Sequence, residues 1–259
     1  VFNIGKIYEQ IEHNDELFPN PVVSGNFIWK GGEKDTEVIF SPDPNGRFKI
    51  SWMPPQELRN KKAFNRGKRI APNTDLGCGG VDSYDLDATV DGRGSKGALH
   101  LYNKFHMDHA SNMFVLEYAS RPPLAKIFYE DVLMAAVFYG YPILIENNKY
   151  GIARYFESKV KVKTKGIPSN SQDIIQAHAH AIEAYIHNHV GLNSDTGEAG
   201  NMYFNKTLED WIGYKIDNRT KFDLTISSGL ALLAAQKVKK KKISNFDERK
   251  FFRRYKVIG

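Results

Sequence analysis

The sequence has little cysteine and no long apolar segment, and each absence excludes a class of protein. A single cysteine, Cys78, excludes an internal disulfide framework and fits a reducing compartment. No apolar run is long enough to cross a bilayer, and the amino end, Val1–Lys6, has no secretory-signal pattern. We therefore expect an intracellular protein that has no membrane partner. The chain also lacks an initiator methionine, so we expect it to be a fragment of a longer protein.

Basic charge is concentrated at the carboxyl end. Of the net charge of +6, a balance of +8 lies between Lys237 and the end, so the other residues together carry −2. The basic character therefore belongs to the tail and does not by itself make the globular body a nucleic-acid binder.

Residues 1–72 are predicted to form an irregular lead-in and a small antiparallel β unit. The segment 41–46 carries strong turn chemistry and predicts a tight turn between the second and third strands of this unit. The expected strands are 26–30, 36–40 and 47–52. A basic connector follows, with Lys61, Lys62, Arg66, Lys68 and Arg69.

Residues 73–236 are predicted to form an α/β domain, followed by a basic tail at 237–259. The first three strands have no helical pattern between them, so we expect an antiparallel meander. A helix between Pro123 and Gly140 then leads to a fourth strand, which right-handed crossover geometry makes parallel to an earlier one. The four strands are expected at 77–83, 98–105, 113–118 and 142–146, and later helices at 173–188, about 207–211 and 223–236.

Three acidic residues stand at the ends of these elements. Asp82 closes the first strand, Glu146 closes the fourth, and Asp223 opens the last helix. If the two strands are parallel neighbours about 4.8 Å apart, their end carboxylates repel one another unless a cation lies between them. Carboxylate-rich sites suit Mg²⁺ or Mn²⁺, which indicates metal-assisted phosphodiester chemistry.

The third acid depends on how closely its helix packs. Asp223 lies in the first helical turn, where the helix dipole favours negative charge, and residues 227–229 are small enough for a close approach to the sheet. Each acid alone also has a structural interpretation: Asp82 as a turn residue, Glu146 as an ion-pair partner, and Asp223 as a helix cap. Together, in this order and on these elements, they favour a metal site.

The order of elements resembles the ribonuclease-H-like fold, a mixed sheet flanked by helices. Within that fold, the chain resembles the nuclease domain of a tailed-phage terminase large subunit over about residues 76–236. The resemblance rests on the motifs 80–82, 97–103, 143–151 and 222–230. The third motif is the most specific, because a strand-end Glu and two Asn precede the Gly that opens the next helix.

The resemblance implies an enzyme that cuts concatemeric double-stranded viral DNA during packaging, in the host cytoplasm. Two ions, Mg²⁺ or Mn²⁺, would be held by Asp82, Glu146 and Asp223; one would activate water and the other would stabilise the leaving oxygen. Many family members carry paired aspartates at the last position, whereas Phe222 precedes the single Asp223 here. The implied partners are an ATPase motor, a portal protein and a small terminase subunit. The chain has no Gly-x-x-x-x-Gly-Lys-Ser/Thr phosphate loop, so we expect the motor upstream of it.

Several basic residues are candidates for DNA contacts. Arg93 and Lys96 lie in the glycine-rich loop 92–97, which matches a dinucleotide fingerprint but precedes a strand and opens no helix. The basic tail combines lysines with aromatic residues and fits docking to DNA or to the portal, with a solvated tail as the alternative. Its candidate contacts are Lys239, Lys240 and Lys241.

The remaining polar side chains are given structural interpretations. Asp85 and Asp87 are predicted to be solvated loop acids, with an auxiliary ligand role as the alternative. Tyr84 is predicted to be a packing residue, with a place in the lining of the acid site as the alternative. Four histidines on or near the helix at 173–188 lack the spacing of a zinc motif: His178, His180, His187 and His189.

Two other functions stay open at this point. The basic connector and tail suggest a DNA-clamping or portal-docking module whose metal site is silent. A Holliday-junction nuclease of the same fold would share the acid geometry, and a comparison of branched with linear substrates would distinguish it.

Overall fold

The computed structural model describes residues 2–84, 96–105, 107, 110–146, 151–160, 166–167 and 172–236. The strands are β1 Val23–Trp29, β2 Val38–Pro42, β3 Phe48–Ile50, β4 Ala63–Asn65, β5 Lys68–Ile70, β6 Gly77–Asp82, β7 Gly97–Asn103, β8 Met113–Ser120, β9 Ile143–Glu146 and β10 Gly166–Ile167. The helices are α1 Ile4–Glu16, α2 Ala125–Tyr139, α3 Gly151–Val160, α4 Gln172–His189, α5 Asn205–Gly213 and α6 Asp223–Gln236. Short 3₁₀ segments occur at Lys30–Gly32, Gln56–Leu58 and Ile216–Lys221.

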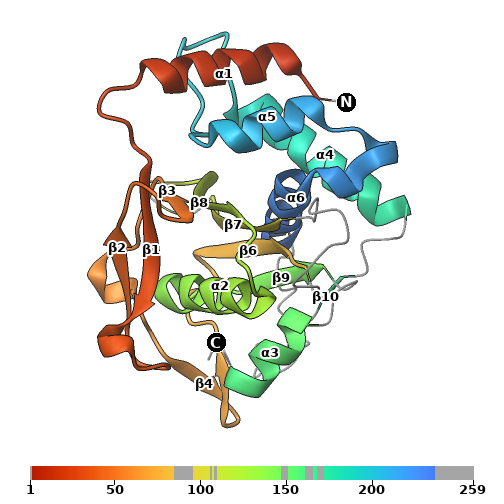
Figure 1. Cartoon of the computed structure of the whole chain (residues 1–259). Coiled ribbons are helices and arrows are strands. Elements are labelled where there is room, and N and C mark those ends of the chain that lie inside the picture. Colours follow the sequence, from red (N-terminus) through yellow and green to blue (C-terminus); the bar gives the residue numbers. More distant parts are fainter. Residues whose placement is uncertain are drawn as a thin grey trace, which may run out of the picture.

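Within the described residues, eight strands form one mixed sheet in the order β10-β9-β6-β7-β8-β3-β1-β2 (Figure 1). β6, β7 and β8 form the predicted antiparallel meander. The chain then passes through α2 and returns as β9, parallel to β6, and β10 is parallel to β9. This arrangement confirms the expected mixed α/β sheet of the ribonuclease-H-like type.

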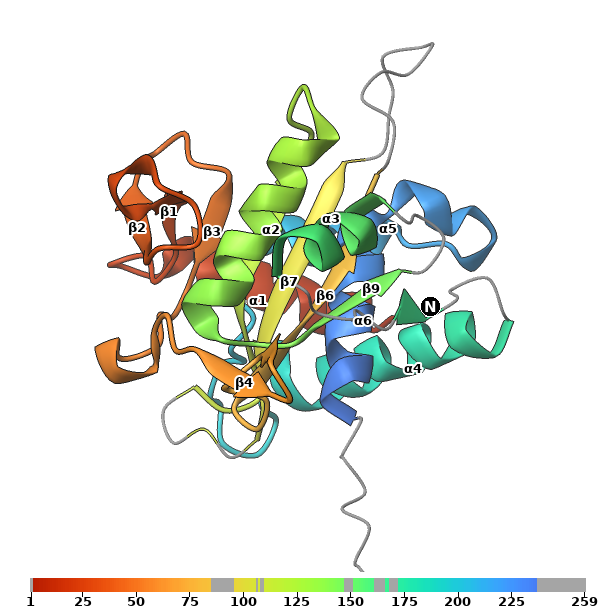
Figure 2. The ribbon, with the colours of Figure 1, turned by 90° about the horizontal axis from the view of Figure 1, so that it is seen from below.

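Helices cover both faces of the sheet (Figures 1 and 2). α2 and α3 lie on one face, whereas α6 crosses β6, β7 and β9 on the other, with α4 and α5 packed against it. Phe128 of α2 and Trp211 of α5 are among the largest fully buried side chains of the two resulting cores. Because both faces are covered, every residue of β6 and β7 is buried.

The predicted boundaries of α2 are confirmed. The helix begins two residues after Pro123 and ends at Gly140, which adopts the left-handed conformation with φ of 70° and whose N–H donates to the Ala136 carbonyl. A glycine at this position can adopt positive φ without strain, so it stops the helix and turns the chain toward β9.

The N-terminal strands extend the large sheet. β1 pairs antiparallel with both β2 and β3, and β3 pairs with β8. The turn predicted at 41–46 therefore does not pair β2 with β3, because β1 lies between them. A Cβ on Gly46 would lie 2.3 Å from the Gly25 Cα, so the chain crosses directly over β1 at this point.

Residues 4–16 form α1, and the prediction of an irregular lead-in is wrong. The Asn3 side chain caps the helix, and its buried residues are Ile7, Gln10 and Asn14. Gln10 donates to Asn14, and Asn14 in turn donates to the Met202 carbonyl at 2.9 Å. Because the inner face is made largely of satisfied amides, it lacks the apolar periodicity that predicts a helix.

A buried ion pair joins the N-terminal strands to α2. Arg47 donates from Nε and Nη2 to the two carboxylate oxygens of Asp131, at 2.8 and 2.9 Å. Tyr118 of β8 donates to the same carboxylate at 3.0 Å. The Asp131 side chain is only 2% exposed, so its charge depends on these donors.

Among the described residues, none of the helices combines the length and the apolar character needed to cross a bilayer.

Candidate metal centre

Two of the predicted acids stand side by side at one edge of the sheet. Asp82 ends β6 and Glu146 ends β9, and the two strands are parallel neighbours with Val81 opposite Ile145. Both residues are buried, with 2% and 5% of their surfaces exposed. The predicted parallel pairing and the predicted positions of both acids at the strand ends are therefore confirmed.

Both acids face α6. Side chains alternate along a strand, and the Cys78 thiol donates to the Ala231 carbonyl of α6, so Asp82, four residues later, is on the same face. On β9, Leu144 clusters with Ile226 of α6, which places Glu146 on that face as well. The two carboxylates consequently lie between the sheet and the helix.

The helix approaches the sheet closely because β6 is rich in glycine. A Cβ on Gly80 would lie 2.2 Å from the Ser227 carbonyl oxygen and 2.3 Å from the Ala231 nitrogen. On the outer side of α6, a Cβ on Gly229 would meet His178 of α4 at 3.2 Å. Glycine at position 80 and small residues on α6 thus permit the close approach that the sequence predicted.

Asp223 begins α6 and lies on the far side of Asp82 from Glu146. Its Oδ2 accepts a hydrogen bond from the Lys96 backbone N–H at 2.8 Å. Lys96 directly precedes β7, in which Ala98 pairs with Asp82. Glu146 and Asp82 thus end the neighbouring strands β9 and β6, and Asp223 of α6 lies next to the start of β7, so Asp82 is in the middle of the row.

Asp210 of α5 is a fourth acid near this edge, and sequence reasoning missed it. Its Oδ2 accepts from the Thr225 N–H at 2.8 Å and from the Thr225 hydroxyl at 2.7 Å, which caps the first turn of α6. Burial raises the pKa of Asp210, and the nearby charge of Asp223 acts in the same direction. Because Asp210 lies on another helix, no local sequence pattern connects it to Asp223.

The donors at this edge fit a hard divalent cation, although they are not drawn together around one point. Among the described residues, no three His, Cys, Asp or Glu side chains form a group that could hold a metal ion. The available donors are carboxylate oxygens, the ligands that Mg²⁺ and Mn²⁺ prefer. Ser83 Oγ, next to Asp82, and His178 Nε2 are buried without a hydrogen-bond partner in the described structure. A hydrated ion would offer partners to such groups.

A buried polar chain anchors α5 and α6 to the sheet beneath the acids. Thr207 of α5 donates to Glu117 of β8 at 2.5 Å, and its hydroxyl oxygen lies 2.8 Å from His100 Nε2 of β7. His100 Nδ1 lies 2.8 Å from the Ser227 hydroxyl oxygen of α6, which also donates to the Leu224 carbonyl at 3.2 Å. Both ring nitrogens of His100 are therefore hydrogen-bonded, and burial favours the neutral imidazole.

We expect His100 to make folding stability depend on pH. Burial lowers the pKa of His100 to about 3, whereas an unfolded imidazole binds a proton below about 6.5. Its contribution to stability is therefore present above pH ~6.5 and is lost as the pH falls toward the folded pKa, by about 1.4 kcal/mol per pH unit. His100→Gln should make the loss of stability between pH ~6 and ~4 shallower by about this amount, as measured by urea unfolding.

A matched control for this experiment is His180→Gln, because the His180 side chain is exposed on α4. The control should leave the pH dependence unchanged. If His100→Gln and the control gave the same pH profile as the unmodified chain, the buried neutral imidazole would be refuted.

The four histidines whose spacing excludes a zinc motif lie in different environments. His178 is buried, and burial lowers its pKa to about 4 against the opposing effect of the Glu146 charge. His180 and His187 are exposed. His178 is thus a neighbour of the acid edge that periodicity alone did not single out. Tyr84 stacks on Phe128 and is buried, which confirms its packing role.

Basic side chains lie along the same edge. Lys96 is exposed beside Asp223, and Lys206 of α5 donates to the Ala119 carbonyl near the end of β8 at 3.5 Å. Arg121, just beyond β8, places its guanidinium carbon 4.5 Å from the centre of the Tyr84 ring. Of these three residues, only Lys96 was predicted to contact DNA.

Some predicted residues lie outside the described part of the chain. They are the loop acids Asp85 and Asp87, the candidate DNA contacts Arg93, Lys239, Lys240 and Lys241, and the motif residues 147–150. Of the glycine-rich loop, Gly97 begins β7 and not a helix, as expected.

Comparisons with known proteins give matches among solved structures alone. No model of a protein family matches the chain, and no curated protein is significantly similar to it. The chain is similar to the large terminase nuclease from thermophilic phage G20c with bound magnesium, at 10% identity and a TM-score of 0.45, over 74% of this chain and 89% of the other. Another structure of that nuclease matches at 9% identity and a TM-score of 0.46, over 73% and 89%.

Proposed function

We propose that this chain is an endonuclease that hydrolyses double-stranded DNA with the help of divalent cations, Mg²⁺ or Mn²⁺. The observation that carries the proposal is the burial of Asp82 and Glu146 at adjacent ends of parallel strands, under a helix that begins at Asp223. Carboxylate oxygens brought together at adjacent strand ends are the ligands that Mg²⁺ and Mn²⁺ prefer in proteins.

Asp82, Glu146 and Asp223 would hold two ions. When bound, such ions lower the pKa of a coordinated water and stabilise the charge that develops on the leaving 3′ oxygen. Asp82, in the middle of the row, would be one of the carboxylates that hold the ions. The Lys96 N–H and the Asp210 cap on α6 hold Asp223 at the start of its helix. The chain that links His100 to Ser227 fixes the same helix to the sheet.

The basic residues of the edge have a matching role toward the substrate. Lys96, Arg121 and Lys206 flank the acids and would bind phosphates on either side of the scissile bond, which positions the duplex without reading its sequence. Hydrolysis by this route leaves a 5′-phosphate and a 3′-hydroxyl.

The biological setting of the proposal comes from the motif resemblance. It is the cutting of concatemeric viral DNA during genome packaging, in the cytoplasm of the infected host. The proposed partners are an ATPase motor, a portal protein and a small terminase subunit.

Cleavage of supercoiled plasmid tests the proposed activity. The chain should nick and linearise the plasmid in Mg²⁺ or Mn²⁺, should be inactive in EDTA, and should leave ends that DNA ligase can rejoin. Salt-sensitive binding without cleavage in either metal would contradict the proposal and favour the DNA-clamping module. Preferential cutting of four-way junctions over linear duplex would favour the Holliday-junction nuclease.

A further inference from the structure

The β4–β5 hairpin is a feature that the proposed cleavage does not use. It was predicted as a connector, but it forms its own two-stranded sheet, with Ala63 opposite Ile70 and Phe64 opposite Arg69. It extends from the body near the end of the molecule opposite α1 (Figure 1). Basic connectors are usually solvated loops. A connector that forms a regular hairpin is therefore a candidate for a binding role.

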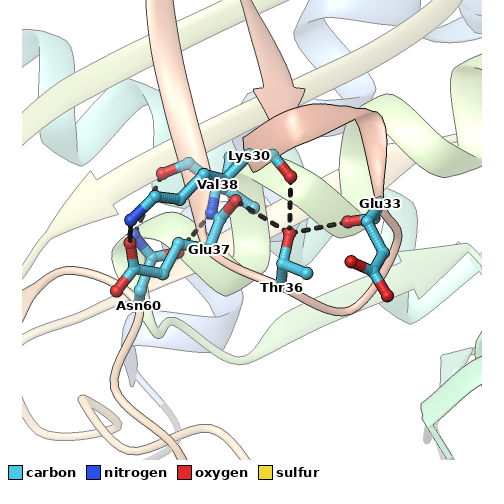
Figure 3. A network of polar contacts seen from close by, with 6 residues as sticks. All are labelled: Lys30, Glu33, Thr36, Glu37, Val38 and Asn60. Carbon is cyan, nitrogen blue, oxygen red and sulfur yellow. Dashed lines mark hydrogen bonds and ion pairs between the residues drawn. The ribbon is translucent and has the colours of Figure 1, made fainter.

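Both roots of the hairpin are fixed by asparagine side chains. Asn60 accepts from the Val38 N–H at 2.9 Å and donates to the Val38 carbonyl at 3.0 Å, so its amide pairs with the open edge of β2 (Figure 3). The Asn60 N–H also donates to the Phe138 carbonyl at 3.2 Å, at the end of α2. At the other root, Asn73 donates to the Tyr139 carbonyl at 2.7 Å. The hairpin is thus held by β2 and α2 in a defined position.

The tip of the hairpin presents an arginine. Arg66 and Gly67 have φ values of 50° and 72°, which is the two-residue turn geometry that matches the twist of a hairpin. Positive φ is uncommon for a residue other than glycine. Arg66 is exposed, so the turn presents a cationic side chain at the tip of the hairpin.

The surface of the hairpin is basic and carries an exposed aromatic ring. Lys61 and Lys62 are exposed at the root of the hairpin and Arg66 is exposed at its tip, and the sequence has no Asp or Glu between Glu57 and Asp75. Phe64 is 64% exposed. Cations that neutralise phosphates, together with an aromatic side chain on which a base can stack, are the combination found on nucleic-acid-binding surfaces.

We propose that the β4–β5 hairpin is a second nucleic-acid contact, which binds the phosphodiester backbone through Lys61, Lys62 and Arg66. The hairpin precedes the amino end of β6, whereas Asp82 ends that strand, whose six residues span about 20 Å, so the hairpin is a contact separate from the acids. This surface binds DNA whether or not the acids cut it. Failure of cleavage and failure of this contact are therefore separate results.

The test compares two double variants that remove the same charge. Lys61→Ser with Arg66→Ser alters the hairpin. Lys6→Ser with Lys215→Ser alters a lysine of α1 and an exposed lysine after α5, next to Tyr214, which stacks on Phe2 near the start of the chain. Binding of a fluorescent duplex is measured in EDTA between ~50 and ~200 mM salt. The hairpin variant should make the dependence of log K on log salt shallower by about 2, since each lost phosphate contact accounts for about 0.9. The control should match the unmodified chain.

A single-stranded probe and the variant Phe64→Ala together show whether the hairpin binds the phosphodiester backbone of single strands or of duplex. If single strands are the ligand, Phe64→Ala should weaken their binding about tenfold and leave the salt dependence unchanged. If duplex is the ligand, Phe64→Ala should have little effect on binding. The double variant Lys61→Ser with Arg66→Ser should then show the whole decrease in salt dependence. An unchanged salt slope in the hairpin variant, or an equal change in the control, overturns the proposal. Loss of binding to poly-glutamate with DNA binding intact would overturn it in favour of an acidic protein partner.

Discussion

Replacing Asp82 by asparagine should reduce metal-dependent DNA cleavage by about 10³-fold or more. The substitution keeps the size of the side chain and removes the charge from the central carboxylate of the row. Metal-assisted charge stabilisation is worth several kcal/mol, and each 1.36 kcal/mol corresponds to about a factor of ten in rate. The initial rate of plasmid nicking in Mg²⁺ and in Mn²⁺ measures the effect. Glu146→Gln should have a comparable effect.

Asp75→Asn is the matched control, because Asp75 is an exposed aspartate at the other end of β6 and the chemical change is identical. It should cut normally. A second measurement excludes misfolding: Mn²⁺ should raise the thermal midpoint of the unmodified chain and of Asp75→Asn, but not that of Asp82→Asn. Undiminished nicking by both Asp82→Asn and Glu146→Gln would show that these acids have no role in cleavage.

Replacing Arg47 by methionine should lower the free energy of unfolding by about 3 kcal/mol. The change leaves the Asp131 carboxylate buried between α2 and the sheet, with the Tyr118 hydroxyl still donating to it. Removing one partner of a buried ion pair costs roughly 3–5 kcal/mol, and the partial exposure of Arg47 places the expected value at the lower end. Urea unfolding followed by tryptophan fluorescence measures the difference.

A second substitution distinguishes a stranded charge from lost packing. Asp131→Asn in the Arg47→Met background should recover part of the stability, because a neutral amide is less costly to bury than an unpaired carboxylate. No recovery would show that the loss comes from the packing of the Arg47 side chain. A loss below ~1 kcal/mol in the single variant would contradict the role assigned to the pair.

Strand-end acids could be predicted from sequence because their positions depend on local pattern. Asp82 and Glu146 each end a short apolar run, and Asp223 starts a run with helical composition. The parallel pairing of β6 with β9 followed from the intervening helix and the handedness of crossovers. The strand-end positions and the parallel pairing were together enough to predict that two of the acids lie at one edge of the sheet.

The errors occurred where polar residues or distant strands decide the structure. α1 was missed because Gln10 and Asn14 occupy its inner face and find hydrogen-bond partners far along the chain. The insertion of β1 between β2 and β3 is a choice of strand order, which the turn at 41–46 does not encode. Asp210 was missed for the same reason, because its hydrogen bond with Thr225 joins two helices that are separate in the sequence.

The basic connector is an intermediate case. The charge of the segment was evident from sequence, but its turn holds an arginine at positive φ, where Gly or Asn is the usual signal for a hairpin. Its roots depend on Asn60 and Asn73, whose partners lie on β2 and α2. The composition of the segment therefore predicted a basic surface, whereas its hairpin structure depends on tertiary contacts that the sequence pattern does not show.

The central claim is that folding brings Asp82, Glu146 and Asp223 to one edge of the sheet as ligands for divalent ions. Crystals soaked in Mn²⁺ and measured at a wavelength where manganese scatters anomalously test it most directly. The account predicts an anomalous peak about 2.1 Å from carboxylate oxygens of Asp82 and Glu146, absent from crystals of Asp82→Asn. Crystals that bind manganese elsewhere, with this edge closed by arginine or lysine side chains, would contradict it.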